Sequence, residues 1–412
     1  PQWMRDLRLH CWETFEALPL PTNKDEEWRR TDLRWLKLDG LRLATPNGAT
    51  PLPAAWQPTA EALAARGGFL VQRDATPAHR TVGDELAAMG VILTDMDTAV
   101  REHGDLVRRA FMTEAVKPTF SKFAALNGAL WSGGTFLYVP DNVEVSLPLQ
   151  SSLWLDEGGL GLFPHTLVVL GRNSKANLIE EAGSQNAEGT LSVPVVELIL
   201  HEGANLTYST MQEFDASPRQ LAIHRAVLER DSTLHWLTVT LGGAWNKLTI
   251  DTELRGPGTN AELLGMYFTD GTEFLDYHTL QDHISPNTNS DLLFKGVLTG
   301  ESRVVFSGLI RVHAGAQKTD AYQKNNNLIL SPHARADSIP NLEISANDVR
   351  CSHGATAGKV AEDQLFYLMS RGLTRHEAER IIVTGFLTPL IERLPLADLR
   401  DRLYALIDAK MS

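Results

Sequence analysis

Apolar and polar residues alternate along the middle of the chain, from about residue 118 to residue 350. This period of two predicts β-strands, because successive side chains of an extended backbone point to opposite faces. Clear examples are residues 135–139, 166–170, 191–200 and 302–307. Turns rich in Gly, Asp, Asn and Ser separate the strands and recur roughly every 25–45 residues, a period typical of repeat architectures. The pattern therefore predicts a β-solenoid, in which each coil buries its inward side chains against the next.

A β-sandwich is the alternative for this region, but no Greek-key pattern is present over its length. Helical patterns flank the strands and could cap the ends of the solenoid. Near the start, Leu7, Cys11 and Phe15 recur at helical spacing before a proline. Near the end, Thr374 and Glu377 form a capping-box pattern that predicts a helix start. The predicted organisation is a mainly helical segment over 1–117, the solenoid over 118–350 and helices over 351–412.

Composition limits the classes of function. The chain of 412 residues has 38 Lys and Arg against 51 Asp and Glu, a formal net charge of −13. This balance argues against a general binder of nucleic acid or anionic membranes, which normally presents a basic face. No apolar run has the length of about 18 residues that a membrane span needs, and the first residues lack a secretory signal pattern. We therefore expect a cytoplasmic protein.

The sequence contains few motifs that would support chemistry within this chain alone. Its two cysteines, Cys11 and Cys351, cannot form a disulfide framework or a four-cysteine zinc or iron–sulfur site. The glycine-rich residues 354–359 lack the spacing of a phosphate-binding loop, so we expect no ATPase here. Asp276 and His278 share a strand face and are predicted to form a structural hydrogen-bonded pair. The remaining histidines of the strand region are also expected to be structural: His201, His224, His235 and His313.

Cys351 and His353 form a different arrangement. An i, i+2 pair on an extended backbone projects its thiol and imidazole to the same side. A nearby imidazolium or helix start would lower the pKa of the thiol and favour the thiolate, the form that binds metal or attacks an electrophile. Two ligands cannot complete a tetrahedral site. The pair is therefore either a half-site that a partner completes, or a buried cysteine beside a turn histidine.

The region around this pair resembles a known family. The motifs cover most of the chain and lie at residues 27–29, 123–127, 282–290, 295–298, 319–328, 340–356, 365–372 and 377–386. Together they resemble the SufB/SufD family of the SUF iron–sulfur cluster assembly system. The string Cys-Ser-His-Gly-Ala-Thr at 351–356 favours the SufD branch, with a SufB-like paralogue as the alternative.

The resemblance implies a right-handed parallel β-helix core between N-terminal and C-terminal helical domains, in agreement with the solenoid. It also implies a non-catalytic scaffold subunit of a SufBCD complex, which pairs with SufB through the β-helix ends. The SufC ATPase would bind the C-terminal helices and hydrolyse ATP, and a desulfurase would supply sulfur indirectly. An isolated chain could instead form a homodimer.

The resemblance also assigns roles to residues. His353 maps onto the cluster-assembly interface with SufB, where it is a metal ligand shared with the partner chain, and Cys351 is a weaker candidate. The expected SufC-docking residues are Phe366, Tyr367, Arg371, Gly372, Glu377 and Phe386. We expect no cofactor bound by the chain alone, only a transient iron–sulfur cluster or iron at the SufB interface. Flavin involvement stays open.

Two enzyme classes are alternatives. A β-helix enzyme acting on acidic polysaccharide would carry paired carboxylates or calcium in a solenoid cleft. Such enzymes normally work outside the cell, and the sequence shows neither a secretion signal nor a dense Asp cluster. A Cys–His hydrolase using Cys351 and His353 would need a third, orienting group.

Overall fold

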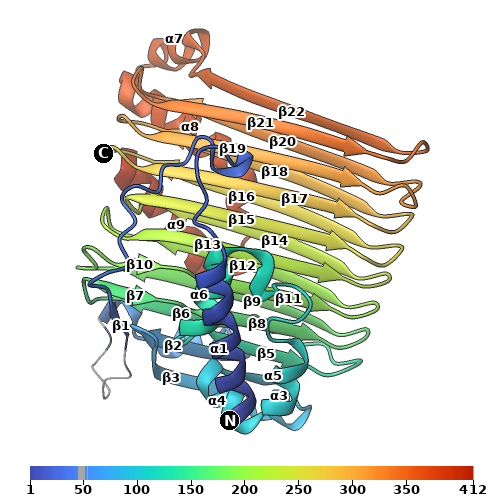
Figure 1. Ribbon diagram of the computed structural model, residues 1–412. Coiled ribbons are helices and arrows are strands. Elements are labelled where there is room, and N and C mark those ends of the chain that lie inside the picture. The colour runs from blue at the N-terminus through green and yellow to red at the C-terminus, as the bar shows by residue number, and fades with distance from the viewer. Residues whose placement is uncertain (45–51, 53, 412) are drawn as a thin grey trace.

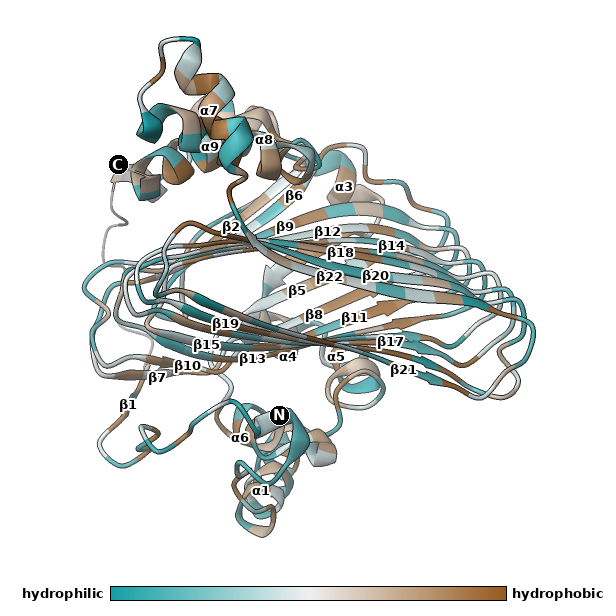
Figure 2. Ribbon diagram, turned by 90° about the horizontal axis from the view of Figure 1, so that it is seen from above, coloured by the Kyte–Doolittle hydropathy of each residue, from teal (hydrophilic) through white to brown (hydrophobic). Residues whose placement is uncertain are grey.

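The strands of the chain wind into a parallel β-solenoid, as predicted (Figure 1). A computed structural model describes residues 1–44, 52 and 54–411. The strands form two sheets, here called sheet I and sheet II, which face each other across the core (Figure 2). From residue 195 to residue 359 successive strands alternate between the two sheets, so each of these coils contributes one strand to each sheet. The prediction of the fold class is confirmed.

Sheet I is 12-stranded and its main path follows the order β21-β19-β17-β15-β13-β11-β8-β5-β4. Its strands are β1 (Arg42–Leu43), β4 (Ile92–Asp95), β5 (Thr135–Val139), β7 (Leu160–Leu162), β8 (His165–Leu170), β10 (Leu191–Ser192), β11 (Val195–Leu200), β13 (Arg219–Leu228), β15 (Trp245–Leu254), β17 (Phe274–His283), β19 (Arg303–Val312) and β21 (Arg335–Ile344).

Sheet II is 10-stranded, in the order β22-β20-β18-β16-β14-β12-β9-β6-β2-β3. Its strands are β2 (Gly68–Arg73), β3 (Thr76–Val82), β6 (Leu149–Leu155), β9 (Lys175–Ser184), β12 (Asn205–Glu213), β14 (Thr233–Leu241), β16 (Asn260–Thr269), β18 (Asn289–Leu298), β20 (Asp320–Ile329) and β22 (Arg350–Lys359).

Register between coils builds the core. Val168, Leu198 and Ala226 occupy the same position on three successive strands of sheet I, and all three are buried between the sheets. The same register at the other inward positions stacks apolar side chains along the solenoid. Burial of each large apolar side chain stabilises the folded state by roughly 1.5–3 kcal/mol. Side chains that bond across adjacent coils are 27 residues apart at His235–Glu262 and 32 apart at Arg311–Glu343. This spacing confirms the period expected from the turns.

Helices cover the outer faces of the two sheets on opposite sides of the solenoid (Figure 2). The N-terminal helices α1 and α4–α6 pack with sheet I, and the C-terminal helices α8 and α9 pack on sheet II. The helices are α1 (Gln2–Ala17), α2 (Ala60–Ala64), α3 (Asp84–Ala88), α4 (Met96–Glu102), α5 (Gly104–Ala110), α6 (Lys122–Leu130), α7 (Glu362–Ser370), α8 (Arg375–Ile391) and α9 (Ala397–Met411), with 3-10 turns η1 (Glu26–Trp28), η2 (Ala54–Trp56) and η3 (Pro118–Phe120).

The N-terminal helix and the α8 start confirm the sequence patterns. Cys11 lies fully buried on α1. Thr374 caps α8: its hydroxyl accepts from the Glu377 N–H, while the Glu377 carboxylate accepts from the Thr374 N–H. The two groups satisfy backbone donors that the first helical turn leaves free.

The two ends of the solenoid differ. At the first end, β3 and β4 run antiparallel to the neighbouring strands β2 and β5 and close the sheets. The C-terminal helices were expected to cap the other end, but Figure 2, which looks along the solenoid, shows them beside sheet II instead. Their apolar stripes bury against Leu237, Val239 and Met266 of that sheet, which is why they lie there.

Candidate functional site

The last coil, formed by β21 and β22, leaves an open end. Within the described part of the chain, β21 pairs only with β19, and β22 pairs only with β20. Inward positions that are buried in earlier coils are exposed here, and Ile344 is 43% exposed. Strand edges with unpaired N–H and C=O groups are templates for pairing with another chain. The end formed by β21 and β22 therefore has strand edges without a neighbour among the described residues.

Cys351 and His353 lie within β22, which continues the sheet past residue 350, where the sequence placed the end of the solenoid. Cys351 is in register with Ala321, and His353 is in register with Gln323. Ala321 and Gln323 are buried inward positions of the preceding coil. The predicted shared face is therefore the face that would bury against a next coil.

The environment of the Cys351 thiol differs from the expectation. Cys351 is half-buried beside an apolar cluster that includes Val312 and Ala321. Burial raises the pKa of its thiol, and the nearby Asp320 carboxylate raises it further. The expected lowering of this pKa is wrong, because the edge of the core and an acidic neighbour outweigh any cationic group. His353, in contrast, is exposed to solvent.

The open end supplies two donor types but no complete site. Among the described residues, no group of three or more His, Cys, Asp or Glu side chains could hold a metal ion. A thiol and an imidazole from one strand could bind iron only together with donors from outside this chain. The two donors on β22 are thus too few to form a metal site by themselves.

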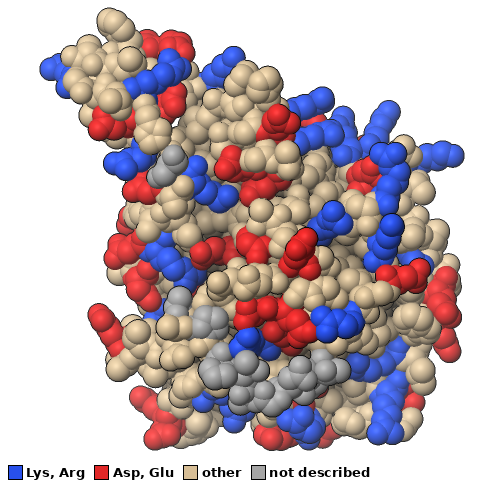
Figure 3. Space-filling view, turned by 90° about the vertical axis from the view of Figure 1, so that its left-hand side faces the viewer, with Lys and Arg blue, Asp and Glu red and all other residues tan. Residues whose placement is uncertain are grey.

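Helix α7 extends from this end as an exposed lobe (Figures 1 and 3). Phe366 is 75% exposed and Tyr367 is 56% exposed, an unusual state for large apolar side chains. The Arg371 guanidinium lies 5.2 Å from the centre of the Tyr367 ring. Gly372, with φ of +97°, ends the helix in the left-handed conformation that glycine favours.

Two of the predicted docking residues have structural contacts. Glu377 belongs to the capping box of α8. The Phe386 ring lies 4.9 Å from Lys295 Nζ, and that ammonium also donates to the Phe386 carbonyl. The capping box stabilises the start of α8 and the Lys295 contacts attach α8 to sheet II, whereas Phe366 and Tyr367 are exposed to solvent.

Comparison with known protein families matches nearly the whole chain. Residues 1–151 match the description "SufBD protein N-terminal region", and residues 153–386 match "SUF system FeS cluster assembly, SufBD core domain". The chain belongs to the SufBD family. The resemblance read from the motifs is therefore confirmed.

Curated relatives agree with this family. The chain is 32% identical to the iron–sulfur cluster assembly protein SufD of Bacillus subtilis, over 100% of this chain and 94% of that protein. It is 29% identical to SufB of the same organism and to a SufBD family protein of Staphylococcus epidermidis, each over 96% of this chain and 87% of the relative. This SufBD family member is thus a SufD homologue that remains similar to SufB.

Polar pairs between neighbouring coils were largely missed by sequence reasoning. In this SufBD family member three histidines of the solenoid pair with carboxylates one coil away: His201–Glu229, His235–Glu262 and His313–Asp282. His201 and His313 lie just after β11 and β19, and His235 lies on β14. Asp276 and His278 lie side by side as predicted, with His278 Nε2 3.1 Å from Asp276 Oδ1, but the contact lacks hydrogen-bond geometry and Asp276 instead bonds to Lys247 Nζ at 2.7 Å. Opposite charges separated by one solenoid period were the signal that could have found these pairs.

Within the part of the chain that the structure describes, His224 does not pair with a carboxylate of a neighbouring coil. It is buried, its Nδ1 has no hydrogen-bond partner among the described residues, and burial lowers its pKa to about 4. Its ring stacks on Trp236 at 6.1 Å. His224 is therefore a neutral packing residue of the core.

No helix in the described ranges has the length and apolarity to cross a membrane.

Proposed function

We propose that this chain is a non-catalytic scaffold subunit for iron–sulfur cluster assembly, which pairs end to end with a SufB-like chain through β21 and β22. The observation that supports this most strongly is the open last coil, which presents His353 and Cys351 at unpaired strand edges. Iron and sulfide are the substrates, and the partner chain supplies the remaining ligands. A homodimer through the same edges is the alternative arrangement.

The C-terminal lobe fits a second partner. We assign Phe366, Tyr367 and Arg371 of α7 to a docking surface for a SufC-type ATPase, in which ATP hydrolysis takes place. Large exposed apolar side chains beside a cation are typical of the anchors in protein interfaces. The mixed charges on the face shown in Figure 3 accord with protein partners rather than with nucleic acid.

A short connection links these two surfaces. β22 ends at Lys359, and α7 begins at Glu362 with Ala361 as its N-cap residue. A displacement of α7 would therefore act directly on the strand that carries Cys351 and His353. As the ATPase subunits approach each other on ATP binding, this link would shift β22 and open the interface to iron and sulfide.

Replacing His353 with alanine is expected to leave pairing with a SufB-like chain intact but lower the yield of reconstituted cluster about 10-fold or more, as loss of a metal-site contact does. Co-purification followed by anaerobic reconstitution and absorption spectroscopy would measure both properties. His10→Ala, which removes an exposed imidazole on α1, is the matched control. An unchanged cluster yield would remove His353 from the proposal.

Arg371→Glu is expected to weaken SufC binding without changing thermal stability, because Arg371 lies outside the helix contacts with sheet II. Glu377→Lys should instead lower thermal stability, because it breaks the capping box of α8. A SufC pull-down and a thermal melt of each variant would separate docking from folding. Full SufC binding by Arg371→Glu would move the docking surface elsewhere.

A further inference from the structure

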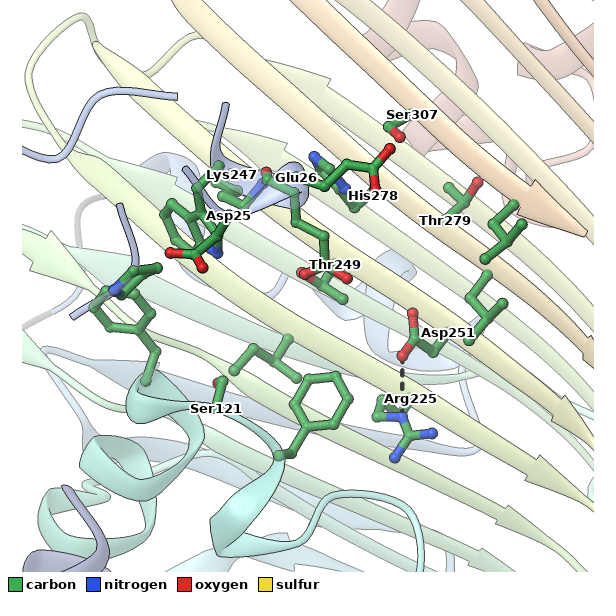
Figure 4. A pocket seen from close by; sticks show the side chains of 18 of the residues that line it. Asp25, Glu26, Ser121, Arg225, Lys247, Thr249, Asp251, His278, Thr279 and Ser307 are labelled. Carbon is green, nitrogen blue, oxygen red and sulfur yellow. Dashed lines mark hydrogen bonds and ion pairs between the residues drawn. The ribbon is translucent and has the colours of Figure 1, made fainter. Parts of the chain in front are cut away.

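A groove of about 1060 Å³ lies on the outer face of sheet I. The C-terminal helices lie on the other side of the solenoid, beside sheet II (Figure 2). Five residues that lie opposite one another on the neighbouring strands β13, β15, β17, β19 and β21 form the floor of the groove. They are Arg225, Asp251, Leu280, Leu309 and Asn341. One wall is the first part of the N-terminal strap, which we define as residues 18–44. The other wall comes from η3 and the start of α6. Figure 4 shows the groove from close by.

The strap is held firmly over the sheet. Trp28 packs between the Phe123 ring, 5.6 Å away, and the Lys247 ammonium, 4.6 Å away. Thr31 donates a hydrogen bond to the buried carboxylate of Asp276. The groove is therefore a preformed feature of the fold with a rigid wall, as ligand sites usually are.

Asp251 is the buried charge of the floor. Its side chain is 10% exposed and faces the groove beside Arg225, with Oδ2 3.3 Å from the Arg225 Nε (Figure 4). No described residue donates a hydrogen bond to this carboxylate. Burial raises its pKa to about 7, with Arg225 and Arg311 opposing the rise and Glu27 and Asp282 adding to it. A buried carboxylate that lacks donors is a group that a ligand cation would stabilise.

The remaining charges of the groove favour a cationic ligand. Its basic side chains already have partners: Arg225 pairs with Asp251 and donates to the Ala115 carbonyl, Lys122 donates to the carbonyls of Phe15 and Leu18, Lys247 pairs with Asp276, and Arg311 pairs with Glu343. Glu26 and Glu27 add carboxylates on the strap. A ligand in the groove thus meets more unneutralised acidic than basic groups.

The shape of the groove indicates an extended occupant. Beyond Asp251 the floor turns apolar at Leu280 and Leu309 before it reaches β21. Five strands about 4.8 Å apart span roughly 19 Å, the length of about six residues of extended chain. One end of such a segment meets a carboxylate, and the rest meets leucine side chains.

We propose that this groove binds an extended basic peptide segment of a partner protein, with an arginine or lysine paired to Asp251 and apolar side chains on Leu280 and Leu309. This assignment does not depend on the role of the open end, because the groove lies on a different face. It adds a third interaction surface to the molecule.

The test uses a fluorescein-labelled hexapeptide with one arginine among leucines and serines, titrated into the full chain and followed by fluorescence polarisation. Saturable binding is expected, weakened at least 10-fold both by Asp251→Asn and by replacing the arginine of the peptide with uncharged citrulline. Asp291→Asn is the matched control, because Asp291 is an exposed carboxylate on the outer face of sheet II whose pKa is also raised, by desolvation and by the Glu262 charge. This variant should bind the peptide as the wild-type chain does.

Three outcomes would overturn the proposal: no saturable binding, equal binding by Asp251→Asn, or equal binding of the citrulline peptide. Displacement of the labelled peptide by putrescine, at a concentration similar to that at which the peptide binds, would also overturn the proposal. The groove would then be a site for small amines. None of these outcomes bears on cluster assembly, so failure here leaves the scaffold proposal standing.

Asp251→Asn is also expected to stabilise the fold at neutral and higher pH, so that lost binding cannot be attributed to unfolding. The pKa of the Asp251 carboxyl is about 7 when folded, against an ordinary value of 3.8, so the folded chain holds this proton more tightly. Stability of the wild-type chain therefore falls as the pH rises from about 4 to about 7. Urea unfolding should give the variant a higher midpoint at pH 8, and the difference should vanish near pH 4. A lower midpoint at pH 8 would contradict the assigned burial cost.

Discussion

Replacing Glu197 with alanine is expected to lower the free energy of unfolding by about 3–5 kcal/mol, because each buried donor left without an acceptor costs roughly 1–3 kcal/mol. Glu197 is fully buried on β11. Its carboxylate accepts hydrogen bonds from the N–H of Met112 at 2.7 Å and of Val116 at 2.9 Å, and it lies 2.9 Å from His165 Nε2. The substitution leaves these three groups buried without an acceptor.

The effect should extend to the attachment of the N-terminal helices. The second nitrogen of His165 lies 2.8 Å from the amide oxygen of Asn127 on α6, and the Asn127 amide nitrogen donates to the carbonyls of Pro164 and Val193. This network joins α6 and the segment 111–117 that follows α5 to sheet I. Its loss would loosen both on that sheet.

Urea unfolding followed by tryptophan fluorescence would measure the change. Glu144→Ala is the matched control, because Glu144 forms an ion pair with Lys175 at 2.9 Å while 62% of its side chain is exposed. Exposed pairs contribute at most about 1 kcal/mol, so this variant should unfold nearly as the wild-type chain does. Equal effects of the two substitutions would show that the buried network does not support the fold.

Ile344→Lys is expected to weaken association with a SufB-like chain about 30-fold or more, the effect of losing a contact worth about 2 kcal/mol at the centre of an interface. Ile344 ends β21 at the open end and is 43% exposed, so the isolated chain should tolerate the change. In a pairing that adds strands to β21 and β22, the lysine would place an unpaired charge inside the new core.

Phe366→Lys tests the proposed SufC-docking surface on α7 in the same experiment. Phe366 is 75% exposed on α7, so its change should weaken SufC binding and leave the end-to-end pairing intact. Sedimentation velocity with each partner would show whether the two variants lose different partners. If both variants lose the same partner, or neither loses any, the assignment of the two surfaces is wrong.

Local signals in the sequence predicted the elements of the fold. The alternation along residues 135–139 predicted β5 with its observed bounds, and the Thr374–Glu377 pattern predicted the start of α8. Both signals depend on neighbours within a few residues, which one sequence shows directly. The turn period likewise predicted the solenoid, since each coil repeats the same step.

The sites could be predicted only in part. The i, i+2 spacing correctly placed Cys351 and His353 on one strand face, but it could not show that this face belongs to an unpaired last coil. The groove on sheet I was missed, because Arg225 and Asp251 lie one coil apart and their carboxylate–guanidinium contact depends on the register. Residues 18–28, which wall the groove, meet these strands only in the folded chain.

The sequence by itself determined the solenoid, its helical flanks and the SufB/SufD family, because periodicity and motifs are properties of the order of residues. Only the tertiary structure decided which end stays open, which carboxylates are buried and which way the pKa of Cys351 moves. Those properties depend on the surroundings of each group: burial penalises a charge, and stacked coils bring residues about 30 positions apart into contact.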